Sequence, residues 1–351
     1  MKILIVAGGT GGHLYPGIAL ARALSGHEIL FVVRRGDMGR DILQKEGFAN
    51  RGIVGQGLPR SISWRALAFP VNFIRGCLET RTLLREIRPD RVVGMGGYLS
   101  IPVILTAHAM GIRTLLHEQN AFPGLANRFL ARWSDSIAVS FATSQSYFPP
   151  GKTWVSGLPI RPDIGRMDRR TSREQLGLDT QTATILVFGG SLGAHTLNSI
   201  SVEAWPLLRS RIPAIQVIHI TGMKDFARIQ KLYESLNLPV KLLPYCHDMA
   251  DAYAAADVVV SRAGASTVAE LLEVRRPALL IPYPYASNNH QVYNAKVLES
   301  EHLGHIVLQD SLTPSVMANR LYEILKAGPI QESASPASSK DAARRLAAHL
   351  L

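Results

Sequence analysis

The amino-acid sequence predicts an α/β fold of two doubly wound domains, each built on a parallel sheet. Short apolar runs of strand length alternate with helical periodicity along the chain. Most of these runs are apolar throughout, which is typical of strands covered on both faces. With 351 residues, the chain exceeds one ordinary core and suits two domains of about 150 residues each.

The expected strands follow in order along the chain. Residues 1–160 form the first expected domain, with strands at Ile3–Ala7, Ile29–Val33, Arg91–Val93, Thr114–Leu116 and Ser136–Val139. Residues 161–335 form the second, with strands at Thr184–Phe188, Gln216–Ile220, Val240–Leu243, Asp257–Val260 and Ala278–Ile281. Helical spacing lies between them, as in Val268–Leu272 and Gln291–Leu298. Residues 336–351 end in an amphipathic pattern, which predicts a terminal helix that packs on the first domain.

Two further features support this division. The Pro- and Gly-rich stretch SGLPIRPDIG (156–165) predicts a linker between the halves. The segment ILVFGGSLGAHTLN (185–198) repeats the opening plan of the chain, in which an apolar strand meets paired glycines and then a helix. We therefore expect two similar sheets.

Composition excludes several classes of protein. The hydrophobic fraction of 47% with 19% charged residues is that of a soluble globular protein. The two cysteines, Cys77 and Cys246, lie far apart and form no metal or disulfide framework, which fits a reducing cytosol. No apolar stretch reaches the ~18 residues that a membrane span needs.

The positive charge is concentrated in the first half. Residues 1–160 hold 18 Lys and Arg against 9 Asp and Glu, a net charge of +9, whereas the remainder holds 20 against 18, a net +2. This asymmetry indicates an anionic partner for one domain. Nucleic acid, an acidic membrane and a phosphorylated ligand all satisfy it.

Three glycine-containing turns lead from a strand into a helix. They lie at Gly8–Gly12, at Gly189–Gly193 and at Gly264 of SRAGASTVAELL (261–272). Glycine lets a ligand approach the backbone, and the helix dipole favours a phosphate there. One such turn is explained equally well by close helix packing, but several in two domains indicate a ligand held in the cleft between them. The spacing is neither G-x-G-x-x-G nor a P-loop, and Arg34 and Arg35 follow the second strand, so a nicotinamide cofactor or a nucleoside triphosphatase is disfavoured.

Seven motifs in order resemble the MurG family of glycosyltransferases. They are GGTGGHLYPGIALA (8–21), GMGGYLSIP (94–102), HEQNAFPGLANR (117–128), GLPIR (157–161), GGSLGAHTLN (189–198), SRAGASTVAEL (261–271) and NHQVYNA (289–295). The family adds N-acetylglucosamine to lipid I in peptidoglycan synthesis and has the two-domain GT-B fold. The resemblance thus implies an acceptor and membrane-side first domain and a second domain for the UDP-sugar donor.

The resemblance also implies a set of binding residues. The Ser191 loop and the helix after Gly264 would approach the diphosphate, the backbone near Cys246 would hold uracil, and Glu270 would bind the ribose hydroxyls. Gln291 would bind the sugar hydroxyls. Asn120 and Arg161 would be further donor contacts. The other implied substrate contacts are the reaction-centre residues Thr10, Gly11 and Gly12, and the helix residues Ala265, Ser266, Thr267, Val268 and Ala269.

The implied reaction is an inverting displacement by the muramyl 4-hydroxyl at the anomeric carbon of UDP-N-acetylglucosamine. His13 is the first candidate for the catalytic base that takes the hydroxyl proton; alternatively it only positions substrate. Glu118 is the second catalytic candidate; alternatively it orients the loop that contains it. The sequence holds no Asp-x-Asp pair of the kind used by metal-dependent sugar transferases. We therefore expect no metal and no cofactor.

A lipid-linked acceptor requires the enzyme to sit on a membrane. Residues 63–88 mix aromatic and aliphatic side chains with arginines, which is typical of an interfacial patch on anionic lipid. The expected patch is Trp64, Arg65, Phe69, Phe73 and Arg75. An ordinary amphipathic helix is the alternative, and it is the favoured interpretation for Leu78, Leu83 and Leu84. The expected location is the cytoplasmic face of the bacterial inner membrane, as a peripheral protein.

Two rival functions remain at this point. A UDP-N-acetylglucosamine 2-epimerase-like enzyme would share the fold and the nucleotide chemistry, but it would need neither the basic patch nor the His13 loop. A nucleic-acid-binding protein is suggested by charge alone and lacks a binding motif or stacking platform, so no nucleic-acid partner is expected. Membership of a cell-wall synthesis complex is left open.

Overall fold

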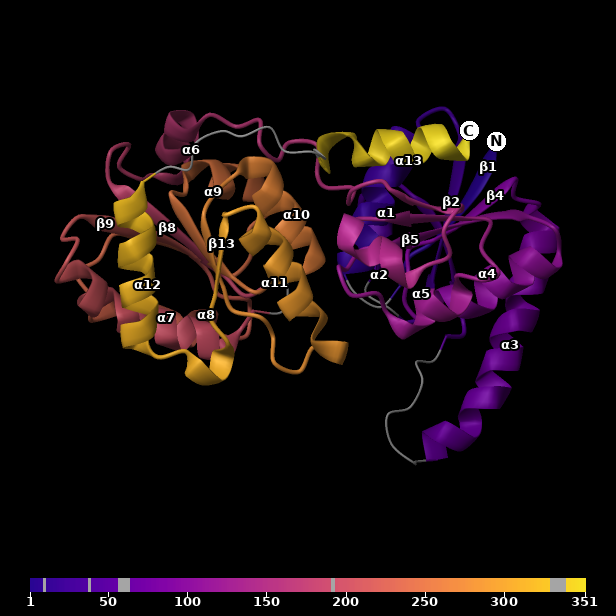
Figure 1. Cartoon of the computed structure of the whole chain (residues 1–351), viewed down its shortest axis with the longest axis horizontal. Helices are drawn as coiled ribbons and strands as arrows, with labels where there is room; N and C mark the ends of the chain where they lie inside the picture. The colour runs from indigo at the N-terminus through magenta and orange to yellow at the C-terminus, as the bar shows by residue number, and fades with distance from the viewer. Residues whose placement is uncertain (9–10, 37–38, 56–63, 191–192, 329–338) are drawn as a thin grey trace. The chain divides into compact units, whose positions relative to one another are not determined.

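A computed structural model describes residues 1–8, 11–36, 39–55, 64–190, 193–328 and 339–351. The chain divides into two compact units, Met1–Arg161 with Ser339–Leu351, and Pro162–Ser338. Each unit is a parallel sheet with helices packed against it (Figure 1). None of the described helices is long and apolar enough to cross a membrane.

The sheet of the first unit has the strand order β3-β2-β1-β4-β5-β6-β7, and neighbouring strands are parallel. Its strands are β1 (Lys2–Val6), β2 (Glu28–Arg34), β3 (Ala49–Ile53), β4 (Arg91–Gly94), β5 (Arg113–Glu118), β6 (Ser136–Val139) and β7 (Thr153–Val155). Its helices are α1 (Gly11–Ala23), α2 (Gly39–Lys45), α3 (Trp64–Ile87), α4 (Ser100–Ala109), α5 (Leu125–Leu130) and α13 (Ala342–Leu350), with 3-10 turns at Ala142–Tyr147 and Ser339–Asp341.

Both faces of this sheet are buried. Along β1, Ile3 and Ile5 belong to the cluster that includes α1 and α13, whereas Leu4 and Val6 belong to the cluster that includes α3 and α4. Helix α13 joins the first cluster through side chains such as Leu346. The C-terminal helix therefore packs on the first unit, beside α1 (Figure 1).

The sheet of the second unit has the order β10-β9-β8-β11-β12-β13, also parallel. Its strands are β8 (Ala183–Phe188), β9 (Ile215–Ile220), β10 (Val240–Leu243), β11 (Val258–Ser261), β12 (Ala278–Leu280) and β13 (Gly304–Ile306). Its helices are α6 (Arg169–Leu176), α7 (His195–Arg209), α8 (Phe226–Glu234), α9 (Met249–Ala255), α10 (Ala265–Val274), α11 (His290–Ser300) and α12 (Pro314–Ala327), with 3-10 turns at Ser287–Asn289 and Gln309–Ser311.

In both units the first strand lies in the interior of the sheet and the chain winds outward from it in both directions. β1 lies between β2 and β4, and β8 lies between β9 and β11. The repeated strand–glycine–helix pattern of the sequence therefore marks the same position in two similar sheets. The predicted doubly wound fold class is confirmed.

Candidate active site

The carboxyl edge of the first sheet brings His13 against a double glycine. β1 and β4 are neighbours, with Val6 opposite Gly94, so the loops that follow them meet where the strand order reverses. A Cβ built on Gly96 would lie 3.3 Å from Cδ2 of His13, and one on Gly97 would lie 3.6 Å from its Cε1. Both glycines also have positive φ, +87° and +76°. The GMGG motif thus makes room for the His13 ring, which is half-buried on the first turn of α1.

Glu118 ends β5, and its carboxylate is only 1% exposed. It accepts hydrogen bonds from the backbone N–H groups of Asn120 (2.8 Å) and Gly124 (3.1 Å) and from the side-chain amides of Asn120 (3.2 Å) and Asn127 (2.8 Å). Burial raises the pKa of Glu118, and these donors oppose the rise. Because the carboxylate is bonded within its own loop, the geometry favours the orienting role of Glu118 over that of a base.

His117 is also fully buried. Its Nδ1 accepts from the Gln119 amide at 2.9 Å, and its Nε2 lies 3.3 Å from the carbonyl oxygen of Gly157. The Gln119 amide also donates to the carbonyl of Met95, at 2.8 Å. His117 and Gln119 therefore tie β5 to the loop after β4 and to the start of the linker, which is a structural task.

The carboxyl edge of the second sheet carries two adjacent helix N-termini. β8 and β11 are neighbours, with Phe188 opposite Ser261, and α7 and α10 begin a few residues after them. The residues that precede these helices, Ala194 and Gly264, have extended backbone and make no side-chain cap. The N-cap side chains of both helices therefore leave the first-turn N–H groups uncapped at one edge, which is a favourable arrangement for a diphosphate.

Glu270 lies on the second turn of α10, and its carboxylate is held from one side. The Tyr253 hydroxyl of α9 donates to Oε2 at 2.9 Å, and the Tyr253 ring packs edge-on against Phe188. Glu270 is 9% exposed, so little of it reaches the surface. Tyr253 is a supporting residue that the sequence did not reveal, because no motif links it to Glu270.

The side-chain amide of Gln291 is hydrogen-bonded to the backbone. Its Oε1 accepts from the N–H groups of Ala263 (3.2 Å) and Tyr283 (2.9 Å), and both donors fix which end of the amide is oxygen. The amide nitrogen is thus the group that remains to donate to a ligand oxygen. Gln291 also fixes the backbone immediately before α10.

Arg262 supplies a buried positive charge beneath the start of α10. Its guanidinium donates to the carbonyl of Ile281 at 3.1 Å and lies over the Tyr283 ring, with 5.6 Å from Cζ to the ring centroid. In the described part of the chain, no carboxylate pairs with it. Burial lowers the pKa of Arg262, yet an arginine stays charged at neutral pH. Sequence reasoning missed this residue, although it stands in the quoted SRAGAST motif.

The other predicted site residues divide between the two edges. Gly11 and Gly12 open α1, and Asn120 follows β5. Ala265, Ser266, Thr267, Val268 and Ala269 are the first residues of α10, whereas half-buried Cys246 lies on the loop after β10, and Arg161 lies within the linker stretch, as the last residue of the first unit before Pro162. Thr10 and Ser191 lie outside the described residues. Among the described residues, no three His, Cys, Asp or Glu side chains converge as a metal site would require.

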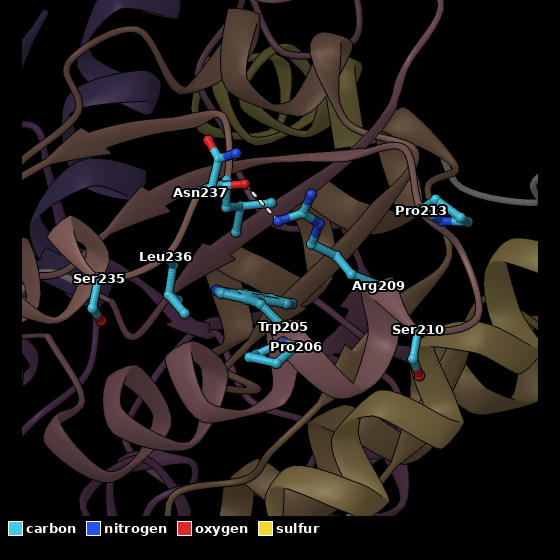
Figure 2. Close-up of a pocket in the computed structure, with 9 residues that line it drawn as sticks. Trp205, Pro206, Arg209, Ser210, Pro213, Ser235, Leu236 and Asn237 are labelled. Atoms are coloured by element: carbon cyan, nitrogen blue, oxygen red, sulfur yellow. Dashed lines mark hydrogen bonds between the residues drawn. The ribbon is translucent and has the colours of Figure 1, made fainter.

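A pocket of about 380 Å³ lies elsewhere in the second unit. It is lined by the end of α7 and by residues 235–238, and Figure 2 shows Arg209 donating to the Asn237 carbonyl beside Trp205. Pro213 and Leu238 precede β9 and β10, so this pocket is at the amino edge of the sheet. It is therefore separate from the loops that carry the predicted site.

Two buried histidines predict a loss of stability in acid. Burial lowers the pKa from 6.5 to about 4 for His117 in the first unit and to about 3 for His219 in the second. Between pH 7 and pH 5 these imidazoles become protonated in the unfolded chain but stay neutral in the folded chain. Each unit is therefore expected to lose about 2 kcal/mol of unfolding free energy. Urea denaturation at both pH values measures this loss. Equal stability at both pH values would show that these imidazoles charge in the folded protein.

Known proteins resemble the chain over its whole length. Residues 3–139 match the glycosyltransferase family 28 N-terminal domain, and residues 184–350 match its C-terminal domain. The UDP-N-acetylglucosamine–N-acetylmuramyl-(pentapeptide) pyrophosphoryl-undecaprenol N-acetylglucosamine transferase of Thermoanaerobacter sp. (strain X514) is 39% identical over 335 residues, 93% of this chain and 90% of the relative. The crystal structure of Acinetobacter baumannii MurG has a TM-score of 0.76 at 28% identity, and each chain is covered to 99%. This chain belongs to the MurG family of glycosyltransferases.

Membership of the MurG family confirms the resemblance, the GT-B fold and the hexosyltransferase class predicted from the sequence. A UDP-N-acetylglucosamine 2-epimerase from Listeria monocytogenes, described as putative, has a TM-score of 0.67 at 14% identity, covering 99% of this chain and 95% of that one. At that identity the likeness is one of fold alone. The epimerase alternative is therefore not favoured.

Proposed function

We propose that this chain transfers N-acetylglucosamine from UDP-N-acetylglucosamine to the muramyl 4-hydroxyl of lipid I, with inversion at the anomeric carbon, to give lipid II. The observation that carries the proposal is the match to a transferase of that name over 93% of this chain. The two adjacent uncapped helix N-termini support it, because a departing UDP needs its diphosphate charge stabilised.

The donor is assigned to the second unit. The first turns of α7 and α10 hold the diphosphate, and the buried charge of Arg262 stands two residues before the N-cap of α10. Glu270, steadied by Tyr253, accepts hydrogen bonds from the ribose hydroxyls. Gln291 donates its amide N–H groups to sugar oxygens, because its own oxygen is bonded to the backbone. Cys246 marks the loop that carries the uracil contacts.

The acceptor is assigned to the first unit. The His13 imidazole takes the proton of the 4-hydroxyl as that oxygen attacks, and Glu118 orients the loop that carries Asn120, a contact assigned to the donor. Backbone at Gly11 and Gly12 lets the sugars come close to α1. These roles rest on the family resemblance and on the position of His13 at the strand-order reversal of the sheet.

Incubation with labelled UDP-N-acetylglucosamine and a lipid I analogue tests the reaction. The expected products are a β-1,4-linked disaccharide lipid and UDP in equal amounts. Appearance of an isomerised UDP-sugar without acceptor would support the 2-epimerase alternative instead. Absence of both reactions would contradict the proposed function.

We also propose that α3 places the enzyme on anionic lipid at the cytoplasmic face of the inner membrane. Val71, Ile74 and Leu78 are 66%, 59% and 58% exposed and are spaced to form one stripe of α3. Arg81 and Arg85 are exposed further along the same helix, and exposed Arg88 directly follows its end. An exposed apolar stripe beside arginines suits the boundary of an anionic membrane.

The proposed stripe differs from the patch expected from the sequence. Leu78 was expected in the core and is exposed, whereas Leu83 and Leu84 are buried as expected. Phe73 is half-buried, and Arg75 is exposed but ion-paired with Glu79. The side chains of Trp64, Arg65 and Phe69 lie outside the described residues.

Replacing Val71, Ile74 and Leu78 with serine is expected to abolish the part of vesicle binding that survives high salt. Apolar insertion does not depend on ionic strength, whereas each arginine contributes about 1 kcal/mol that screening removes. Sedimentation with anionic vesicles at low and high salt measures both parts. Turnover of a water-soluble acceptor should remain unchanged.

The matched control changes exposed apolar residues of the second unit, Leu207 and Met223, to serine. That variant should bind vesicles as the wild type does. Equal binding by the wild type to neutral and anionic vesicles would contradict the arginine contribution. Unchanged salt-resistant binding of the triple variant would contradict the α3 stripe.

A further inference from the structure

A chain of buried polar side chains crosses the core of the second unit. The indole N–H of Trp205 donates to the Tyr233 hydroxyl oxygen at 2.8 Å, and that oxygen lies 2.9 Å from Nδ1 of His219. On the other side of the ring, Nε2 of His219 lies 3.1 Å from Oδ1 of Asn198. Apart from Tyr233, which is 6% exposed, these side chains are fully buried. We call Trp205, Tyr233, His219 and Asn198 the relay.

Each hydrogen bond of the relay has one possible direction. An indole N–H only donates, so the Tyr233 oxygen accepts it and gives its own proton to Nδ1 of His219. Burial lowers the pKa of His219 to about 3, so the ring is neutral and carries its single proton on Nε2. That proton goes to Oδ1 of Asn198. The His219 tautomer therefore supplies the N–H that Oδ1 of Asn198 accepts, which matches the amide orientation that the two acceptors of its nitrogen require.

The amide nitrogen of Asn198 then holds the segment around the start of α7. It donates to the carbonyl oxygen of Thr221 at 2.9 Å and to Oδ2 of Asp225 at 2.7 Å. Thr221 directly follows β9, and a Cβ on Gly193 would overlap its carbonyl oxygen, so the glycine turn before α7 packs on that carbonyl. Asp225 also contacts Nδ1 of His195, the first residue of α7, at 3.0 Å.

We propose that His219 and Tyr233 are positioning residues for the donor diphosphate, because they hold Asn198 through its Oδ1 and thereby fix the first turn of α7. The inference rests on the proposed function, which assigns the diphosphate to that turn. Ala194 provides no side-chain cap, so the hydrogen bonds of Asn198 to Thr221 and Asp225 are the contacts that hold this turn in the proposal. A turn fixed before the ligand arrives presents its N–H groups without reorganisation.

The deciding comparison is between Tyr233→Phe and Trp205→Phe. Tyr233→Phe removes the proton that selects the His219 tautomer, so the ring can move its proton to Nδ1 and leave Oδ1 of Asn198 without a donor. Trp205→Phe removes only the donor to the tyrosine oxygen and leaves the Tyr233–His219–Asn198 direction intact. Tyr233→Phe loses two buried hydrogen bonds and Trp205→Phe loses one, so both variants should have a lower Tm, and Tyr233→Phe the lower of the two. His219→Gln is a third variant that removes the imidazole itself.

The measurements are the Kd of UDP by calorimetry, the donor and acceptor KM, kcat, and Tm. Tyr233→Phe and His219→Gln are expected to weaken UDP binding roughly five- to tenfold and to lower donor kcat/KM, with acceptor KM unchanged. Trp205→Phe should keep the Kd of UDP within twofold. Equal changes of UDP affinity in Tyr233→Phe and Trp205→Phe, or no change in any variant, would show that the relay only stabilises the core.

The proposed function and the positioning role of the relay can be contradicted separately. A wild-type chain that neither binds UDP nor transfers sugar contradicts the proposed function. If the wild type binds UDP and all variants have the same Kd of UDP as the wild type, only the positioning role of the relay is contradicted. If Tyr233→Phe does not fold, the His219→Gln and Trp205→Phe pair makes the same comparison.

Discussion

Replacing His13 with alanine is expected to lower kcat by about 100-fold or more, because the attacking hydroxyl loses its proton acceptor. The affinity for UDP should change little, since the nucleotide is assigned to the second unit. Steady-state kinetics with a lipid I analogue, together with calorimetry of UDP binding, measures both. Loss of UDP affinity with kcat retained would show that His13 binds nucleotide.

A second substitution separates base catalysis from positioning. His13→Asn keeps a hydrogen-bonding group next to Gly96 and Gly97 but cannot take a proton at neutral pH. If His13 is the base, this variant is as slow as His13→Ala, and the acid limb of the kcat–pH profile disappears. If His13 only positions the acceptor, His13→Asn keeps most of kcat and the limb remains. Glu118→Gln gives the corresponding test of the second candidate, and its expected effect is smaller because the Glu118 carboxylate is bonded within its own loop.

Replacing Glu270 with alanine is expected to raise the donor KM about 10- to 150-fold, which corresponds to the loss of a charged hydrogen bond worth about 1.5–3 kcal/mol. The fold should survive, because Tyr253 keeps its packing against Phe188. The acceptor KM should not move. Initial rates at varied donor concentration measure the effect.

The sharper form of this test uses a donor with a 2′-deoxyribose. The wild type should discriminate against the deoxy donor, and Glu270→Ala should lose part of that discrimination, because its partner hydroxyl is the group removed. Tyr253→Phe, which removes the hydroxyl that donates to Oε2 of Glu270, should show a smaller rise in donor KM. Wild-type kinetics in Glu270→Ala, or full discrimination by that variant, would contradict the ribose assignment.

Several strands could not be predicted from the sequence, and they share a position. β3, β7 and β13 each lie at the edge of a sheet, where only one side of the strand is paired. Their sequences, ANRGI, TWV and GHI, are short or polar, and they are only partly buried in the structure. The interior strands were found because burial on both faces requires continuous apolar runs. Edge strands escape that requirement, so pattern alone did not mark these three, although it did mark the edge strand β10, whose sequence VKLL is mostly apolar.

The sequence by itself determined the parallel α/β class, the family and the glycine turns at both sheet edges, because strand-length apolar runs, motif order and turn glycines are properties of neighbouring residues. Only the tertiary structure decided the roles that depend on distant contacts. In the fold, the Glu118 carboxylate is hydrogen-bonded within its own loop, and the Tyr253 hydroxyl donates to Glu270. Leu78 is exposed, whereas Leu84 is buried. The fold also joins Trp205, Tyr233, His219 and Asn198, which no spacing in the sequence connects. Hydrogen-bond direction and burial arise from the packing of separate elements. These two properties distinguish a residue that contacts substrate from a residue that positions such a contact residue.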